Sequence, residues 1–192
     1  MSDLPPLFGE DHSCPTCRLA YADLGVDRCL ALVGESTTAL AALLPTVGDE
    51  ALRRRPRPEV WSAVEYACHV RDVLLTFAVR VHRGVVEDRP MLDPMYADGR
   101  AERFGYAATR LDVLLAELSA AAQGFGDEVR SVPGDAWDRG VARRPEEVRT
   151  VRWLVRQAAH ECVHHLADVT ASISPVPPRT SGAAAPPSPE GS

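Results

Sequence analysis

Apolar residues recur at steps of three and four along four segments, and this spacing limits the possible folds more than any other feature. The segments cover residues 25–44, 62–83, 106–129 and 150–173. Residues three and four apart share one face of a helix, so each segment has the apolar stripe of a helix that packs against neighbours. No segment has a convincing strand pattern. The chain is therefore predicted to be all-α, a four-helix bundle.

The ends of these helices and the links between them carry recognisable signals. Ser62 and Glu65 have the spacing of a capping box at the start of the second helix. Gly84 is typical of a helix end, and Thr150 is a candidate cap for the fourth helix. The connection from residue 85 to about residue 105 is long for a tight turn. We expect it to be a crossover between the second and third helices that lines a pocket.

The chain divides into three parts by composition. Residues 1–20 are predicted to be an irregular N-terminal segment that contains the motif CPTC, and residues 21–174 the bundle itself. Residues 175–192 are rich in proline, serine, alanine and glycine and are predicted to be disordered.

Charge and composition argue against several classes of function. The 192 residues carry a net charge of −6, and all 21 basic residues are arginines without an evident basic face, so nucleic-acid binding is not expected. The first residues are acidic and lack the apolar core of a signal peptide. The sequence has no uninterrupted apolar run of the length that a membrane span requires. A cytoplasmic protein is the resulting expectation.

Five cysteines fit this expectation as free thiols or metal ligands better than as structural disulfides. They are Cys14, Cys17, Cys29, Cys68 and Cys162.

Two histidines one helical turn apart give the strongest chemical signal. His160 and His164 are four residues apart, so both imidazoles lie on one face of the fourth helix and can bind one divalent cation. A third ligand is expected from His69, because an unpartnered imidazole in so apolar a helix is costly. Asp72 and Asp168 are placed to orient the ligands. The predicted metal site is therefore His69, His160 and His164.

A second ligand set on the fourth helix competes with this one. Glu161 and His165 are also four residues apart, but they face about 100° away from the histidine pair, so the two pairs cannot bind the same ion. The alternative metal site would use Glu161 and His165, which with His69 gives two histidines and a carboxylate. His165 also lies near the apolar stripe of this helix, so it could instead be a packed core residue without a metal.

The CPTC motif is a candidate for a second metal site. Cys14 and Cys17 provide half of a zinc site, and His12 could add a third ligand. The alternative is a pair of ordinary thiols near a terminus.

Arginines are numerous in the loops that are expected to flank the open end of the bundle. Arginine suits two-pronged recognition of carboxylates. Candidates for binding an anionic substrate or thiol cofactor are Arg139, Arg143 and Trp137.

Two stretches resemble a known superfamily. WSAVEYACHVRDV, with His69, and AAHECVHHLADV, near the end of the fourth helix, are similar to motifs of the DinB/YfiT-like superfamily over residues 14–173. The similarity is greatest to its thiol-dependent members, the mycothiol-dependent transferases and maleylpyruvate isomerases.

The resemblance implies a four-helix bundle with a crossover and a divalent metal, zinc or nickel. One histidine of the second helix and an HxxxH pair of the fourth would bind it, which correspond to His69, His160 and His164. In the isomerase branch the pair is Glu-xxx-His, which corresponds to Glu161 and His165.

The function that the resemblance implies is activation of a small thiol such as mycothiol for attack on an electrophile. An S-transferase or isomerase is therefore the first expectation. The alternatives are a non-catalytic metal-binding or stress-response protein and a metal-dependent hydrolase. The resemblance also allows a homodimer.

Overall fold

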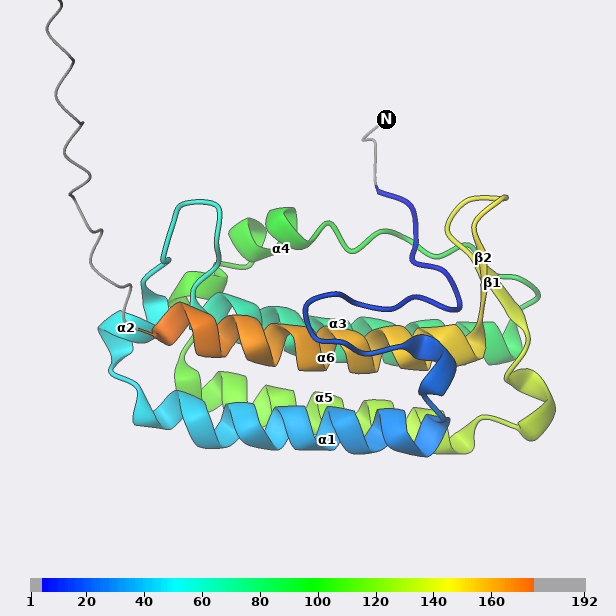
Figure 1. Cartoon of the computed structure of the whole chain (residues 1–192), viewed down its shortest axis with the longest axis horizontal. Helices are drawn as coiled ribbons and strands as arrows, with labels where there is room; N and C mark the ends of the chain where they lie inside the picture. The colour runs from blue at the N-terminus through cyan, green and yellow to red at the C-terminus, as the bar shows by residue number, and fades with distance from the viewer. Residues whose placement is uncertain (1–4, 175–192) are drawn as a thin grey trace, which may run out of the picture.

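Four long helices form the body of the protein (Figure 1). The structure, a computed structural model, describes residues 5–174. The long helices are α1 (Val26–Leu43), α3 (Ala63–Val86), α5 (Leu111–Ser131) and α6 (Val151–Ile173). They confirm the predicted four-helix bundle.

Short elements occupy the connections. The helical ones are α2 (Asp49–Arg53), α4 (Ala97–Arg103) and four 3₁₀ turns: η1 (Tyr21–Asp23), η2 (Leu44–Thr46), η3 (Tyr106–Ala108) and η4 (Gly134–Ala136). Strands β1 (Gly140–Ala142) and β2 (Val148–Thr150) form an antiparallel hairpin. No strand was predicted there, because three-residue strands are too short to show an alternating pattern.

The caps of the two central helices are as predicted. The Ser62 hydroxyl accepts the Glu65 N–H at 3.4 Å, and the Glu65 carboxylate accepts the Ser62 N–H at 2.9 Å. Thr150 Oγ1 accepts the Trp153 N–H at 3.0 Å at the start of α6. These bonds satisfy N–H groups that a helix start leaves without partners. They fix where α3 and α6 begin.

The end of α3 differs from the prediction. Helix α3 continues through Gly84 to Val86. A Cβ at Gly84 would lie 2.7 Å from Val151 Cγ2 and 3.0 Å from Val141 Cγ1. Glycine is therefore explained by the close approach of α3 to β1 and α6, and it does not end the helix.

The order of the helices explains the long crossover. Helices α3 and α5 run in the same direction in Figure 1, so the chain must return along the bundle between them, and it does so through α4. Helix α3 packs against both α5 and α6, whereas α1 packs against α6 and α5. Helix α6 thus lies next to α3 on one side and α1 on another.

The N-terminal segment lies across α6 (Figure 1). Arg149 Nη2 donates to the Leu7 carbonyl at 2.9 Å, and Glu10 Oε1 accepts the Thr150 N–H at 2.7 Å. These bonds attach the segment to β2 and to the start of α6. The predicted disordered tail, 175–192, falls outside the described residues.

Helix α1 and the turn after it, Val26–Thr46, are long and apolar enough to cross a membrane by length and composition alone. This is weak support for a span, because a core helix passes the same test, and α1 packs against α5 and α6.

Candidate metal centre

Three donor side chains meet between α3 and α6. His69 comes from α3, and Glu161 and His165 come from α6; their donor atoms all lie within 4.8 Å of one another. Glu161 Oε2 is 3.1 Å from His165 Nε2 and 3.4 Å from His69 Nε2. We call this trio the open cluster, because it borders a cavity described below.

The hydrogen bonds of His165 indicate that the open cluster needs a positive charge. His165 Nδ1 lies 2.8 Å from Asp168 Oδ2, so Nδ1 carries the proton of the neutral ring. Nε2 then directs a lone pair at Glu161 Oε2, an acceptor facing an acceptor. Such a contact requires a cation between the atoms, either a second proton on the ring or a metal ion. Imidazole and carboxylate are ligands that zinc accepts, so the cluster fits a divalent metal.

The pKa shifts in the open cluster arise from the same close contacts between carboxylates and imidazole rings. Burial lowers the pKa of His165, but Asp168 and Glu161 outweigh it and raise the pKa to about 9. Burial raises the pKa of Glu161, but hydrogen bonds from His165 and His69 bring it well below its usual value. His69 Nδ1 is buried without a hydrogen-bond partner among residues 5–174. The cluster thus concentrates one full negative charge between two imidazoles.

A second group of donors lies where the N-terminal segment meets α6. Its donor atoms also lie within 4.8 Å of one another. We call it the closed cluster; its members are Cys14, Cys17, His160 and His164. Burial lowers the pKa of His160 to about 4, so its ring is neutral at pH 7.

The structure therefore does not bring the expected three-histidine set together. His69 lies with Glu161 and His165, the alternative pair, whereas His160 and His164 face the N-terminal segment. Successive helix residues are about 100° apart, and α3 packs on the side of α6 that carries the glutamate. Periodicity shows that two pairs have different faces, but not which face meets α3.

The other predicted participants are also redistributed. His12 stacks on Phe8 with ring centroids 3.8 Å apart and is not a member of either cluster. Asp168 contacts His165 as expected. Asp72 instead accepts hydrogen bonds from Arg100 and Tyr106, so it holds the crossover to α3.

A cavity of about 530 Å³ adjoins the open cluster. Its wall includes both cluster and apolar residues: His69, Glu161, Phe8, Met95, Phe77 and Trp153. Phe8 belongs to the N-terminal segment and Met95 to the crossover, which confirms the expectation that the crossover lines a pocket. Two segments that are far apart in sequence therefore cover the open cluster.

Arg80 is a charged residue of this cavity that was not predicted from the sequence. Among residues 5–174 it makes no direct ion pair; its guanidinium lies over the Phe77 ring, and its Nη2 donates to the Asp93 carbonyl. Burial lowers its pKa to about 10, so it is still charged at pH 7. It lies eleven residues after His69, close to three full turns, so both share one face of α3. That spacing could have found it.

Of the three predicted substrate-binding residues, Arg143 alone lines the cavity. It is paired with Glu147 at 2.9 Å and donates to the Pro5 carbonyl. Arg139 donates to the carbonyls of Gly84 and Glu87, which anchors the hairpin. Trp137 packs beneath the guanidinium of Arg152. The latter two therefore have structural contacts away from the cavity.

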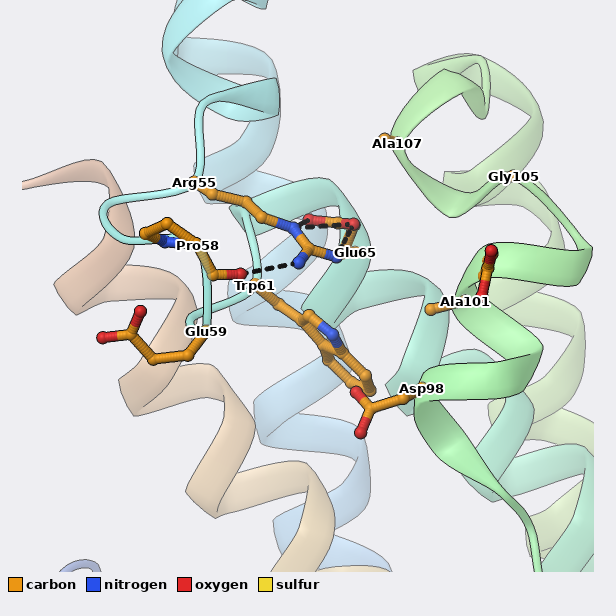
Figure 2. A pocket seen from close by; sticks show the side chains of 10 residues that line it. Arg55, Pro58, Glu59, Trp61, Glu65, Asp98, Ala101, Gly105 and Ala107 are labelled. Carbon is orange, nitrogen blue, oxygen red and sulfur yellow. Dashed lines mark hydrogen bonds and ion pairs between the residues drawn. The ribbon is translucent and has the colours of Figure 1, made fainter.

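A second pocket, of about 620 Å³, lies beside the first turn of α3 (Figure 2). Trp61 and Asp98 project into it, and Arg55 binds Glu65 at its rim with a 2.6 Å ion pair. The Trp61 ring also stands 5.3 Å from that of His69. No member of either cluster lines this pocket, so the smaller cavity is the better candidate for chemistry at the metal.

Comparison with known proteins gives the family. The sequence profile described as DinB superfamily matches residues 33–169. A search of curated protein sequences gave no significant match.

Two solved structures share the fold. YfiT from Bacillus subtilis, described as a probable metal-dependent hydrolase with an unusual four-helix bundle topology, aligns with a TM-score of 0.70 and 18% identity over 77% of this chain and 85% of its own. A mycothiol-dependent maleylpyruvate isomerase aligns with a TM-score of 0.62 and 16% identity, over 77% of this chain and only 62% of its own. With the profile match over most of its length, the chain belongs to the DinB superfamily.

Proposed function

We propose that the protein is a metal-dependent enzyme whose divalent ion, zinc or nickel, is bound by His69, Glu161 and His165. The observation that carries this proposal is the convergence of these three donors, two of which, His69 and Glu161, line the cavity. Three protein ligands leave a position for substrate, as in catalytic zinc sites. When bound, such an ion lowers the pKa of a coordinated thiol or water.

The chain's own residues would then orient the ligands and exclude water. Asp168 holds the Nδ1–H of His165, which leaves Nε2 unprotonated for the metal. Phe8 and Met95 bring apolar surface to the cavity from two separate segments. Arg80, which is charged and makes no direct ion pair among residues 5–174, would bind an anionic group of the substrate.

The reaction we propose is transfer of a small thiol such as mycothiol to an anionic electrophile, or thiol-assisted isomerisation of one. The arginine in the cavity supports an anionic substrate, and the fold shared with a mycothiol-dependent isomerase supports a thiol. Hydrolysis is the second candidate, supported by the likeness to a probable metal-dependent hydrolase.

The test is an assay of the full chain loaded with zinc or nickel. The protein is incubated with mycothiol and either a carboxylated electrophile or a reporter such as monochlorobimane, and separately with ester and amide substrates without thiol. Metal-dependent conjugation or isomerisation that is lost in Glu161→Gln supports the thiol proposal.

The control is Glu128→Gln. This change removes a carboxylate on α5 that pairs with His82, and neither residue belongs to a cluster. Cleavage without thiol would favour the hydrolase. Thiol binding without turnover would contradict an enzymatic function, and equal turnover in Glu161→Gln would contradict the ligand set.

A further inference from the structure

The N-terminal segment forms a small hairpin that presents both cysteines to α6. The Cys14 N–H donates to the Leu19 carbonyl at 2.9 Å, and the Arg18 N–H donates to the Cys14 carbonyl at 2.9 Å. Ser13 and Ala20 pair as an antiparallel bridge at its base. These bonds fold the CPTC sequence into a tight loop with the two sulfurs near each other.

The hydrogen bonds of Tyr21 reveal which nitrogen of His160 is available to a ligand. Tyr21 donates its O–H to Gln157 Oε1 at 2.6 Å. Its oxygen lies 3.0 Å from His160 Nδ1 and, having given its only proton to the glutamine, must accept there. His160 Nδ1 therefore carries the ring proton, and Nε2 has a lone pair.

This lone pair of His160 has no partner. Nε2 is buried and makes no hydrogen bond within the described residues, and His160 as a whole residue is 4% exposed. An unpaired acceptor in such a place is costly. The neighbouring donor atoms are those of the closed cluster, and Cys14 Sγ lies 3.7 Å from His164 Nδ1. In a tetrahedral zinc site, sulfur and nitrogen ligands are roughly 3.6 Å apart, given Zn–S of about 2.3 Å and Zn–N of about 2.0–2.1 Å.

We propose that the closed cluster is a structural zinc site, separate from the open cluster, that fastens the N-terminal hairpin to α6. Its four ligands are Cys14, Cys17, His160 and His164. Four protein ligands leave no position for substrate, which distinguishes structural from catalytic zinc. Binding releases the two thiol protons, and two thiolates balance the charge of the ion, so that the site is neutral.

The closed cluster is joined to the open one by a hydrogen-bonded route and by the carboxylate of Asp168. From His160 the chain of donors runs through Tyr21 to Gln157, whose Nε2 donates to Glu161 Oε1 at 2.6 Å. On the other side, Asp168 Oδ2 lies 3.7 Å from His164 Nε2 and 2.8 Å from His165 Nδ1. The closed site would therefore orient ligands of the open one. This last step rests on the proposed function, whereas the zinc site does not.

The test uses the full chain, reduced and loaded with cobalt(II) in place of zinc. A thiolate-to-cobalt charge-transfer band arises from a site with cysteine ligands and not from histidine and carboxylate, so the two clusters give separate signals. We expect the band in the wild-type protein, its loss in Cys17→Ser, and its retention in Cys29→Ala, which alters a buried cysteine outside both clusters. His165→Ala should keep the band while total bound metal falls.

A ligand exchange keeps the proposal testable if Cys17→Ser does not fold. His164→Cys should still bind one ion here and should strengthen the band, because a third thiolate joins the site. Absence of the band in the reduced wild type, or a band that survives His160→Ala unchanged, would overturn the proposal. So would purified protein in which a Cys14–Cys17 disulfide persists and, after reduction, no metal is bound.

Discussion

Glu161 and His160 are neighbours in sequence, yet they serve different clusters. Glu161 is contacted by His69, His165 and Gln157, all through its two carboxylate oxygens. His160 points to the N-terminal hairpin. One helix thus contributes interleaved side chains to two donor clusters, because a step of one residue turns the side chain by about 100°.

Asp168 contacts one histidine of each cluster, His165 of the open cluster and His164 of the closed one. Replacing it in Asp168→Asn should lower metal affinity about 10- to 100-fold, the usual effect of removing a carboxylate behind a histidine ligand. The protein should remain folded, since Asp168 is not part of the core. Titration with a chromophoric chelator measures the affinity. Unchanged affinity at both sites would show that Asp168 does not orient the ligands.

Arg80 is the second residue that governs function at this scale. In Arg80→Met the cavity loses its charged donor, at a cost of about 1.5–3 kcal/mol in binding. The expected result is a KM for a carboxylated substrate that rises roughly 10- to 100-fold, with metal content unchanged. Arg130→Met, at an exposed ion pair on α5, is the control. A fall in kcat with an unchanged KM would contradict the assignment.

At the level of elements, the position of α6 decides the arrangement. It packs against α3 on one side and underlies the N-terminal segment on another. The first contact builds the open cluster and the second builds the closed one. Near the C-terminal end of α3, Gly84 lies close to Val151 of α6 and Val141 of β1, and this contact helps to fix the packing.

Gly84 tests that fit. In Gly84→Ala the added methyl would meet Val151 and Val141 at 2.7 and 3.0 Å, and overpacking of this kind costs about 1–3 kcal/mol. Gly124→Ala is the matched control: it is also helical, with no atom within 4 Å of the new Cβ, and should be neutral or stabilising by up to about 1 kcal/mol. Urea unfolding measures both. Equal effects would mean that packing at Gly84 is not tight.

The crossover is held to α3 by the hydrogen bonds that Asp72 accepts from Arg100 and Tyr106. Burial raises the pKa of Asp72, but hydrogen bonds from Tyr106, Arg100 and Arg71 lower it below its usual value. A lowered folded-state pKa stabilises the protein above about pH 4, and this stabilisation disappears as the pH falls through the folded-state pKa. Asp72→Asn should cost about 2 kcal/mol near pH 7.

The pH dependence provides the check on Asp72. The difference in unfolding free energy between wild type and Asp72→Asn should shrink as the pH is lowered below about 4. Asp112→Asn, at an exposed pair with Arg110, should leave the unfolding midpoint unchanged. A difference that stays constant with pH would indicate that the carboxylate charge is not what holds the crossover.

For the whole molecule, local patterns predicted more of the fold than of the site. Helix periodicity and the caps at Ser62 and Thr150 predicted the four helices, because these signals depend on residues near in sequence. The length of the connection after α3 predicted the crossover. The hairpin of β1 and β2 has too few residues to show a pattern.

The grouping of these donor side chains could not be decided from the sequence, because it depends on tertiary packing. Periodicity and the CPTC motif identified the residues of both clusters, but the first expectation joined His160 and His164 to His69 and kept Glu161 and His165 as the alternative. The partners of His160 and His164 in the structure are Cys14 and Cys17, about 150 residues away, and only the path of the N-terminal segment over α6 brings them there.

The central claim is that two metal sites divide these ligands, and anomalous diffraction at the zinc edge from crystals of the reduced, zinc-loaded full chain tests it most directly. We expect two peaks per chain, one among His69, Glu161 and His165 and the other among the two cysteines and His160 and His164. A single peak bounded by His69, His160 and His164 would contradict it.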